Sequence, residues 1–375
     1  MTIQKVPRDP ENLEMLRLYA AVDPTEAVGA GLRDTERLDE FLARARTSLE
    51  RSIATPSRMH GLRAQAMFRA TLVALGQFQL LIDEDAGDPY YDDDIGRLAP
   101  PDFRIVDSAG DALSIEVKSV KLNDPLKPFG VRKSDVEAWR RWGELTGAPV
   151  SLALWWAIPG RWTLVSLDHL QPRGSKLEID LPHAIVADEM SRFGDSLLGT
   201  KPPLIFRVHC EQEGPIDAET GEASIRITDT EMLVDGRKLV DKLERRIAWV
   251  FFRFGGWEAE QELQHGPGGD VTAIDLVACP PGSDDERQAQ QEFASVGMLS
   301  SLYAALFNEA TLSPEGDVDQ LEHRPEPGEL ADLIPDNFWE RPDRVLPLWR
   351  FNIQPRNPEE QRTRGGAPPT GSPHD

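Results

Sequence analysis

Residues 100–120, PPDFRIVDSAGDALSIEVKSV, restrict the fold of this chain more than any other stretch. Apolar and polar residues alternate on both sides of a short polar turn, which is the pattern of a β-hairpin. A three-residue loop, Ser108-Ala109-Gly110, would close it, with Gly110 at the position that needs a positive φ. The sequence therefore predicts two antiparallel strands joined by this loop.

The loop length fixes which residues of the two strands face each other. Counting outward from Ala109, Phe103 faces Ile115 and Asp102 faces Glu116. A two- or four-residue loop would shift the strands and separate the two carboxylates. Side chains alternate between the two faces of a strand. One face of the hairpin is therefore apolar, and the other carries both carboxylates. The apolar face consists of Phe103, Ile105, Leu113, Ile115 and Val117.

A carboxylate pair across two strands needs a physical reason. Facing residues have Cβ atoms roughly 4.5–5.5 Å apart, and two carboxylates that close repel unless one is protonated or a cation lies between them. Mg²⁺ binds through one or two carboxylates together with water and phosphate oxygens. Lys118, two residues beyond Glu116, reaches the same space, where an ammonium could polarise an attacking water. The pattern favours half of a metal site; the alternative is an exposed hairpin with ordinary surface charges.

The segments around the hairpin predict an α/β layer with a mixed sheet. A helix after the break at Thr55-Pro56-Ser57 would end at Gly76, and a helix over 134–145 would begin with Ser134 as its N-cap and end near Gly147. Strands are expected at 78–82, 150–158 and 162–167. Helices, strands and a hairpin in this order are typical of a mixed sheet flanked by helices.

The remaining sequence suggests further parts. Residues 1–55 are expected to form a helical extension, with helices at 12–22 and 35–53. A joint is expected at Gln171-Pro172-Arg173-Gly174, followed over 171–354 by a second α/β or α+β domain of unknown role. In this domain we expect strands at 204–209, 223–227 and 271–277 and helices at 238–246 and 286–308. Residues 355–375 have little to bury and are expected to be a disordered tail.

Charge and composition limit the function classes. The net charge of −23 argues against non-specific binding to a polyanion. However, arginines are concentrated between residues 43 and 71 and lysines between 118 and 133, so a locally basic surface compatible with nucleic acid remains open. The alternative is that these cations are the solvated faces of helices.

Cysteine content and the N-terminus bear on the compartment. Two cysteines are too few for a disulfide scaffold or a thiolate metal site. The sequence has no apolar run long enough to span a bilayer, and residues 1–16 lack the layout of a signal peptide. We therefore expect a cytoplasmic protein without a membrane partner.

Pro101-Asp102, a gap across a hairpin, and then Glu116-Val117-Lys118 resemble the PD-(D/E)XK motif of the restriction-endonuclease-like nucleases. That family often has a G-x-x-x-E run on the preceding helix. Here the matching run is GLRAQ, residues 61–65, with Gln65 where Glu is usual. The segment FGVRK, residues 129–133, followed by a helix and a strand, is also similar. The resemblance covers residues 56–170, which it implies form a nuclease-like domain with a restriction-endonuclease-like mixed sheet.

The resemblance implies a role for each matching residue. Asp102 and Glu116 would ligate Mg²⁺, for which Mn²⁺ often substitutes, and the Val117 carbonyl would contribute. Lys118 would assist the attacking water, and Gln65 would lie behind the ligands, able to orient a water but not to act as a base. The residues implied to contact substrate phosphate are Lys133 and Arg132.

The resemblance thus implies a Mg²⁺-dependent endodeoxyribonuclease that serves in phage defence or DNA repair. The protein would bind a second copy of the chain or another protein of a defence system. Two rivals stay open: a catalytically inactive nuclease-fold protein that binds nucleic acid or protein, favoured by Gln65, and an acidic inhibitor or DNA mimic, favoured by the net charge.

Overall fold

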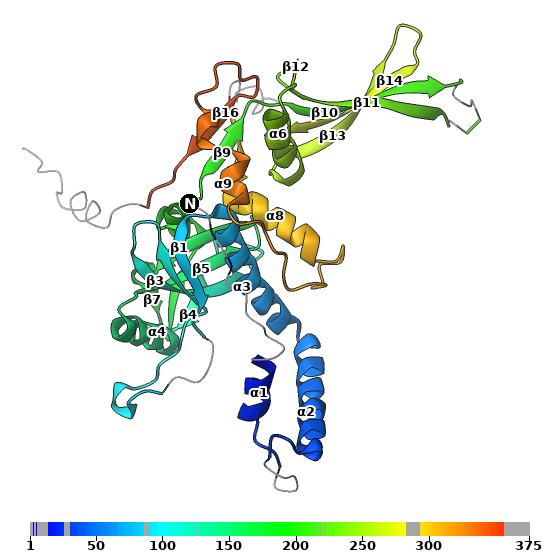
Figure 1. The fold of residues 1–375 in the computed structure, drawn as a ribbon. Coiled ribbons are helices and arrows are strands. Elements are labelled where there is room, and N and C mark those ends of the chain that lie inside the picture. The colour runs from blue at the N-terminus through cyan, green and yellow to red at the C-terminus, as the bar shows by residue number, and fades with distance from the viewer. Residues whose placement is uncertain are drawn as a thin grey trace, which may run out of the picture.

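The computed structural model describes residues 3, 5, 14–25, 31–85, 90–124, 126–215, 217, 219–220, 222–282 and 293–355 (Figure 1). Several sheets are flanked by helices, so the predicted mixed α/β fold class is confirmed. The predicted tail, apart from residue 355, lies outside the described residues, as do residues 12–13 of the first expected helix and residues 286–292 of the last.

The first sheet has five strands in the order β1-β2-β3-β5-β6. Their bounds are β1 Phe78–Asp83, β2 Phe103–Asp107, β3 Ala112–Val120, β5 Val150–Trp156 and β6 Arg161–Ser166. β3 and β5 are parallel, whereas the other neighbours are antiparallel. A parallel pair needs a crossover connection, and helix α4 (Lys133–Thr146) lies in that connection. The sheet is therefore mixed, as predicted.

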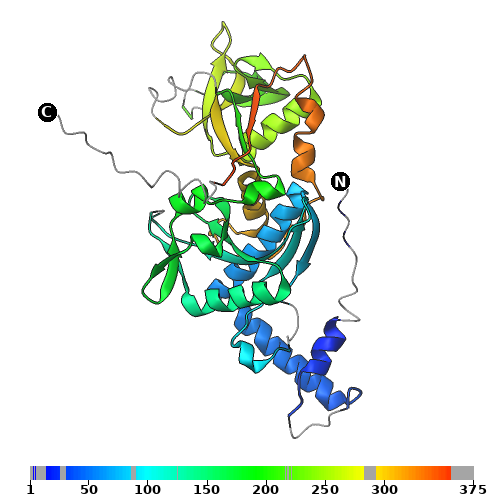
Figure 2. The same ribbon diagram turned by 90° about the vertical axis from the view of Figure 1, so that its left-hand side faces the viewer.

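Two helices cover opposite faces of this sheet (Figure 2). Helix α3 (Pro56–Leu75) packs Met67 and Phe68 against the buried face that carries Ile115. Helix α4 packs Val136 and Trp139 against the other face, among alternate residues of β5. Gly76 ends α3 with φ +72°, as expected of a helix C-cap glycine.

The hairpin of β2 and β3 has the predicted register. Phe103 pairs with Ile115, Arg104 with Ser114, Ile105 with Leu113 and Val106 with Ala112. Gly110 has φ +95° in the loop. The predicted apolar face is confirmed, since its five side chains are all buried in one core cluster.

The start of α4 differs from the prediction. Its N-cap residue is Arg132, not Ser134, and no side chain caps the helix. Strand β4 (Phe129–Arg132) runs directly into the helix, and the Lys133 amide donates a hydrogen bond of 3.1 Å to the Ser175 carbonyl. A backbone acceptor from a remote turn thus satisfies the first amide of the helix, which begins one residue before the predicted cap.

Strand structure continues past residue 170. Residues 171–173, expected at a domain joint, form β7 (Gln171–Arg173), which pairs with β8 (Lys176–Ile179), and β8 pairs with β4. This hairpin therefore lies beside the start of α4. The division of the chain into parts at residues 55, 170 and 354 stays a prediction.

The rest of the chain forms two more sheets. One has the order β12-β11-β10-β14-β13 and the other β15-β9-β16. The strands are β9 Leu197–Thr200, β10 Leu204–Glu213, β11 Ser224–Val234, β12 Arg237–Lys238, β13 Glu258–His265, β14 Val271–Cys279, β15 Ala294–Met298 and β16 Leu348–Phe351. The remaining α-helices among the described residues are α1 Met15–Ala21, α2 Thr35–Ile53, α5 Leu181–Val186, α6 Lys242–Phe254, α8 Leu299–Thr311 and α9 Glu329–Leu333.

The three strands expected in the second half are confirmed as parts of β10, β11 and β14, but both helices are displaced. The helix expected over 238–246 is α6, which begins later because the Asp241 carboxylate caps it, accepting from the Leu243 and Glu244 amides at 2.9 and 3.0 Å. Within the expected helix 286–308, residues 294–298 form strand β15 instead. Pairing with β9 satisfies the backbone there.

The second half packs directly on α3. The Arg63 guanidinium donates to Thr311 Oγ1 at 2.9 Å and to Asn308 Oδ1 at 2.5 Å, both on α8. One core cluster includes side chains of α3, the first sheet, α6 and α8. Of the helices in the described residues, none has the length and apolar character needed to cross a membrane.

Asp195→Asn is expected to change how stability depends on pH. The Asp195 carboxylate is buried and accepts from the Ser300 amide at 2.9 Å and the Ser300 hydroxyl at 2.6 Å. Burial raises its pKa from 3.8 to about 6. Because the folded-state pKa is the higher one, the stabilisation is fully present below pH ~4 and lost as the pH rises through ~6, about 3 kcal/mol in all.

Urea unfolding at several pH values measures this effect. The free energy of unfolding of the wild type should fall relative to that of Asp195→Asn between pH ~4 and ~7. Asparagine keeps the carbonyl acceptor and has no charge, so the variant supplies the reference for all other titrating groups. Parallel pH profiles for the two proteins would contradict the assignment.

Candidate active site

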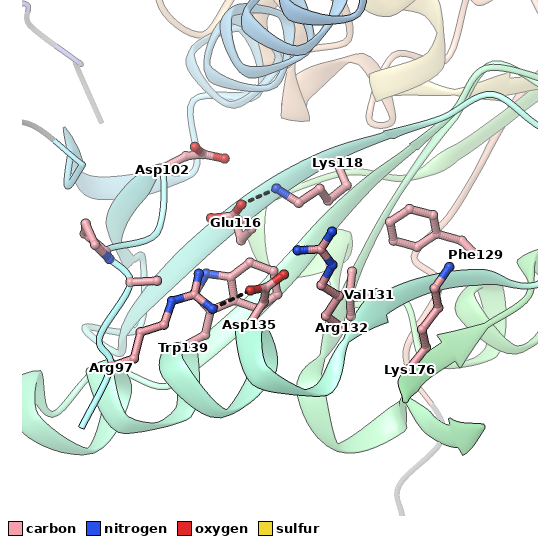
Figure 3. Close-up of a pocket in the computed structure, with 13 residues that line it drawn as sticks. Arg97, Asp102, Glu116, Lys118, Phe129, Val131, Arg132, Asp135, Trp139 and Lys176 are labelled. Atoms are coloured by element: carbon pink, nitrogen blue, oxygen red, sulfur yellow. Dashed lines mark hydrogen bonds and ion pairs between the residues drawn. The ribbon is translucent and has the colours of Figure 1, made fainter. Parts of the chain in front are cut away.

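A cleft of about 510 Å³ opens on the α4 side of the first sheet (Figure 3). Asp102 precedes β2, Glu116 and Lys118 lie on β3, and all three line the cleft. The other polar side chains that line it are Arg97, Arg132, Asp135 and Lys176. The cleft therefore combines residues of the hairpin, of α4 and of the β7–β8 hairpin.

Two hydrogen bonds fix the Asp102 carboxylate. Oδ1 accepts from Gln65 Nε2 at 2.6 Å, and Oδ2 accepts from the Val117 amide at 2.7 Å. Gln65 lies on α3, so the helix before the first strand reaches the site as expected. The Val117 amide comes from the neighbouring strand β3. Asp102 is thus held from two elements while it remains on the cleft wall.

Glu116 and Lys118 form an ion pair within the cleft (Figure 3). They lie two residues apart on β3 and so project from the same face. The Glu116 side chain is buried, whereas the Lys118 side chain is 36% exposed. Lys118 Nζ also lies 5.6 Å from the centroid of the Trp139 ring of α4. The ammonium is therefore positioned by a carboxylate and an aromatic face, with access to solvent.

The two acidic side chains carry an electrostatic cost. Burial and, next, the Glu116 charge raise the pKa of Asp102 to about 7, although the Val117 amide and Lys118 oppose the shift. Burial also raises the pKa of Glu116, and Lys118 opposes that shift. Asp85 adds negative potential at both carboxylates. One ammonium does not compensate this charge, which a proton on Asp102 or a further cation would offset.

The donor set fits a divalent metal ion with few protein ligands. In the described part of the chain, no group of three or more His, Cys, Asp and Glu side chains is arranged to hold a metal. Asp102 and Glu116 together supply the one or two carboxylates that Mg²⁺ usually takes, which leaves positions for water and phosphate oxygen. The Val117 amide is used by Asp102, and the role expected for the Val117 carbonyl stays a prediction.

The two residues expected to contact phosphate are placed differently. Arg132 lines the cleft, whereas Lys133, the first residue of α4, is not among the lining residues. Lys176 of the β7–β8 hairpin lines the cleft on the same side as Arg132 (Figure 3). Arg97 is engaged by Asp135 at 2.7 Å. No ion pair engages Arg132 or Lys176 within the described part of the chain, so these two residues form the basic edge of the cleft.

Four residues near the site have no role in it predicted from the sequence. Asp135 and Trp139 are four residues apart on α4, a spacing that places them on one helix face, and this signal was available. Asp85 follows β1 in an acidic stretch that gives no sign of which member approaches the carboxylates. Lys176 lies beyond the segment that resembles the nuclease family, so only the fold brings it to the cleft.

Comparisons with known proteins add little to this geometry. No protein-family model matches the sequence, and a search of curated proteins finds no match. Among solved structures, Hjc of Archaeoglobus fulgidus, a Holliday junction resolvase from an archaeal hyperthermophile, is similar to part of the chain. It is 20% identical, the match covers 36% of this chain and 96% of that one, and the TM-score is 0.28. A likeness of this size assigns no activity.

Proposed function

We propose that this chain is a metal-dependent nuclease of the PD-(D/E)XK type that hydrolyses phosphodiester bonds of DNA. The observation that carries the proposal is the meeting of Asp102, Glu116 and Lys118 in one cleft. All three line that cleft, and Gln65 of the preceding helix donates a hydrogen bond to Asp102. The strand order of the first sheet, with an antiparallel hairpin next to a parallel neighbour, is compatible with the proposal.

Asp102 and Glu116 would hold a Mg²⁺ or Mn²⁺ ion. When bound, such an ion stabilises negative charge on phosphate oxygens and lowers the pKa of a bound water. Gln65 and the Val117 amide keep the Asp102 carboxylate in place. Because the fold supplies this orientation before substrate arrives, little reorganisation is needed during the reaction.

Lys118 would act on the water and on the phosphate. Its ammonium can donate a hydrogen bond to the attacking water and offset charge on the non-bridging oxygens. The water oxygen would form a bond to phosphorus as the bond from phosphorus to the leaving oxygen breaks; the water gives up a proton to solvent, and the leaving oxygen takes one from solvent. Trp139 beside Nζ restricts the ammonium to this part of the cleft.

Arg132 and Lys176 would bind the DNA backbone. They are cationic groups at the edge of the cleft in a protein with a net charge of −23. Phosphate contacts position a nucleic acid without reading its sequence. The local basic edge, and not the overall charge, would therefore attract the substrate. We place this activity in the cytoplasm, in phage defence or DNA repair, with the second half selecting the target or sensing a trigger.

A catalytically inactive protein that binds nucleic acid is the second candidate. Gln65 favours it, because an amide cannot ionise and removes one carboxylate from the position where the nuclease family often has Glu. The cleft would then hold a backbone phosphate without cutting it.

Nicking of supercoiled plasmid separates the two candidates. The wild-type protein is expected to nick plasmid with Mg²⁺ or Mn²⁺ and to lose all nicking in EDTA, because two carboxylates without a cation repel the substrate phosphate. DNA binding measured in parallel at fixed salt gives the second readout. Binding without nicking in either metal would favour the inactive candidate, and nicking that persists in EDTA would contradict the proposed chemistry.

A further inference from the structure

One side of α2 exposes a stripe of apolar side chains. Leu38, Leu42, Leu49 and Ile53 are 44%, 51%, 62% and 65% exposed. Figures 1 and 2 show α1 and α2 together at one end of the molecule, projecting away from the sheets. Isolated exposed leucines are common, but an aligned apolar stripe on a projecting helix is characteristic of an interaction surface.

The face of α2 next to this stripe is already covered by α1. The buried residues of α2 are Arg37 and Phe41. The Phe41 ring lies 5.2 Å from that of Tyr19, edge to face, and the Arg37 guanidinium lies 5.1 Å from the Tyr19 ring. The contact with α1 therefore leaves the stripe uncovered within the described residues.

The spacing of the stripe is that of a coiled-coil seam. Leu38, Leu42, Ala45 and Leu49 follow one another at intervals of four, three and four residues. Such intervals place side chains along the line where two helices pack knobs into holes. The spacing therefore predicts that this face of α2 packs against another helix with the same spacing of apolar residues.

The charges on α2 indicate what that helix is. Its N-terminal half is mainly acidic and its C-terminal half mainly basic. After the N-cap Asp34, the first half carries Glu36, Asp39 and Glu40 with the buried Arg37 among them, and the second half carries Arg44, Arg46 and Arg51 with Glu50 among them. A second copy of α2 in antiparallel orientation would bring each acidic half against a basic half, whereas a parallel copy would bring like charges together.

We propose that α2 pairs with α2 of a second copy of this chain in an antiparallel, two-fold symmetric dimer. The heptad spacing sets Leu38 against Leu49 of the partner subunit, and Leu42 against Ala45 of the partner subunit. A two-fold axis repeats each contact. The contact is independent of the active site, so it stands whether or not the chain cuts DNA.

The same spacing places Asp39 beside Arg46 of the partner subunit. Asp39 is exposed, and no hydrogen bond or ion pair of its side chain is found among the described residues. Arg46 donates to Glu50 at 2.9 Å, but both side chains are mostly exposed, so that ion pair contributes little. Both groups are therefore available to pair across the interface.

Sedimentation equilibrium of the full chain tests the seam. The wild type is expected to approach twice the chain mass of 41.8 kDa as concentration rises. Leu42→Asp should weaken self-association by about 100-fold or more, because each dimer loses two buried leucines. Leu145→Asp is the matched control, since Leu145 is 55% exposed on α4, and it should leave self-association unchanged.

A charge exchange tests the orientation and does not depend on altering the apolar seam. Asp39→Arg and Arg46→Asp should each weaken the dimer, and the double variant should restore it, because the antiparallel pair is then rebuilt with its charges reversed. Far-UV circular dichroism checks that each variant keeps its helices. A wild type that stays monomeric at every concentration, or a double variant that does not recover, would overturn the proposal and leave the stripe to another protein or a membrane.

Discussion

Lys118→Met is expected to slow metal-dependent plasmid nicking by about 100- to 1000-fold, the size of effect seen when one preorganised charge-stabilising donor is removed. Methionine keeps much of the aliphatic stem that packs beside Trp139, so the fold of the cleft should persist. The ammonium, which forms the ion pair with Glu116 and would approach the water, is lost. The rate of nicking under saturating Mg²⁺ is the measurement.

A neighbouring lysine provides the control for this experiment. Lys121 follows β3, three residues beyond Lys118, and is not among the residues that line the cleft. Lys121→Met removes the same charge from the protein and should keep nicking close to the wild-type rate. DNA affinity of both variants at one salt concentration shows whether a slow rate reflects chemistry or binding. Equal losses of rate in the two variants would refute the role assigned to Lys118.

Trp162→Ala is expected to lower the free energy of unfolding by about 3–5 kcal/mol. Trp162 of β6 is fully buried, with its ring centroid 5.0 Å from that of Phe68 on α3 and 5.2 Å from that of Trp155 on β5. Truncation would leave a cavity between the first sheet and α3, the helix that carries Gln65 to the site. Urea unfolding followed by circular dichroism measures the change.

Trp162→Phe tests whether the loss of stability in Trp162→Ala comes from the lost packing of an aromatic ring. The Trp162 Nε1 is buried and has no hydrogen-bond partner among the described residues, so phenylalanine removes a polar group that gains nothing in the core. We expect this variant to lose less than about 1.5 kcal/mol, because an aromatic ring still fills most of the space. Similar losses for the two variants would show that Trp162 does not hold α3 on the sheet.

The hairpin and its surroundings could be predicted because their signals are local. Gly110 and the alternation on either side of it specify the register within twenty residues of sequence, and the structure has that register. Gly76 ends α3 for an equally local reason. The family motif placed Gln65 near Asp102, and the hydrogen bond between them is present.

Errors arose where a remote segment decided the local structure. Ser134 has the residue type of an N-cap, yet the Ser175 carbonyl takes the first amide of α4. Residues 294–298 occur in a segment expected to be helical, but β9 offers a free edge and makes them a strand. Local propensity amounts to a fraction of a kcal/mol per residue, so a set of tertiary hydrogen bonds and a buried face can outweigh it.

The sequence by itself determined the register of the hairpin and the strand face that Glu116 and Lys118 share, because hairpin pairing depends only on neighbours along the chain. The tertiary structure alone decided what surrounds them. Packing of α4 brought Trp139 to Lys118, and the pairing of β8 with β4 brought Lys176 to the cleft. Those contacts join elements that are far apart in sequence, and they depend on which buried surfaces fit together, which no local pattern records.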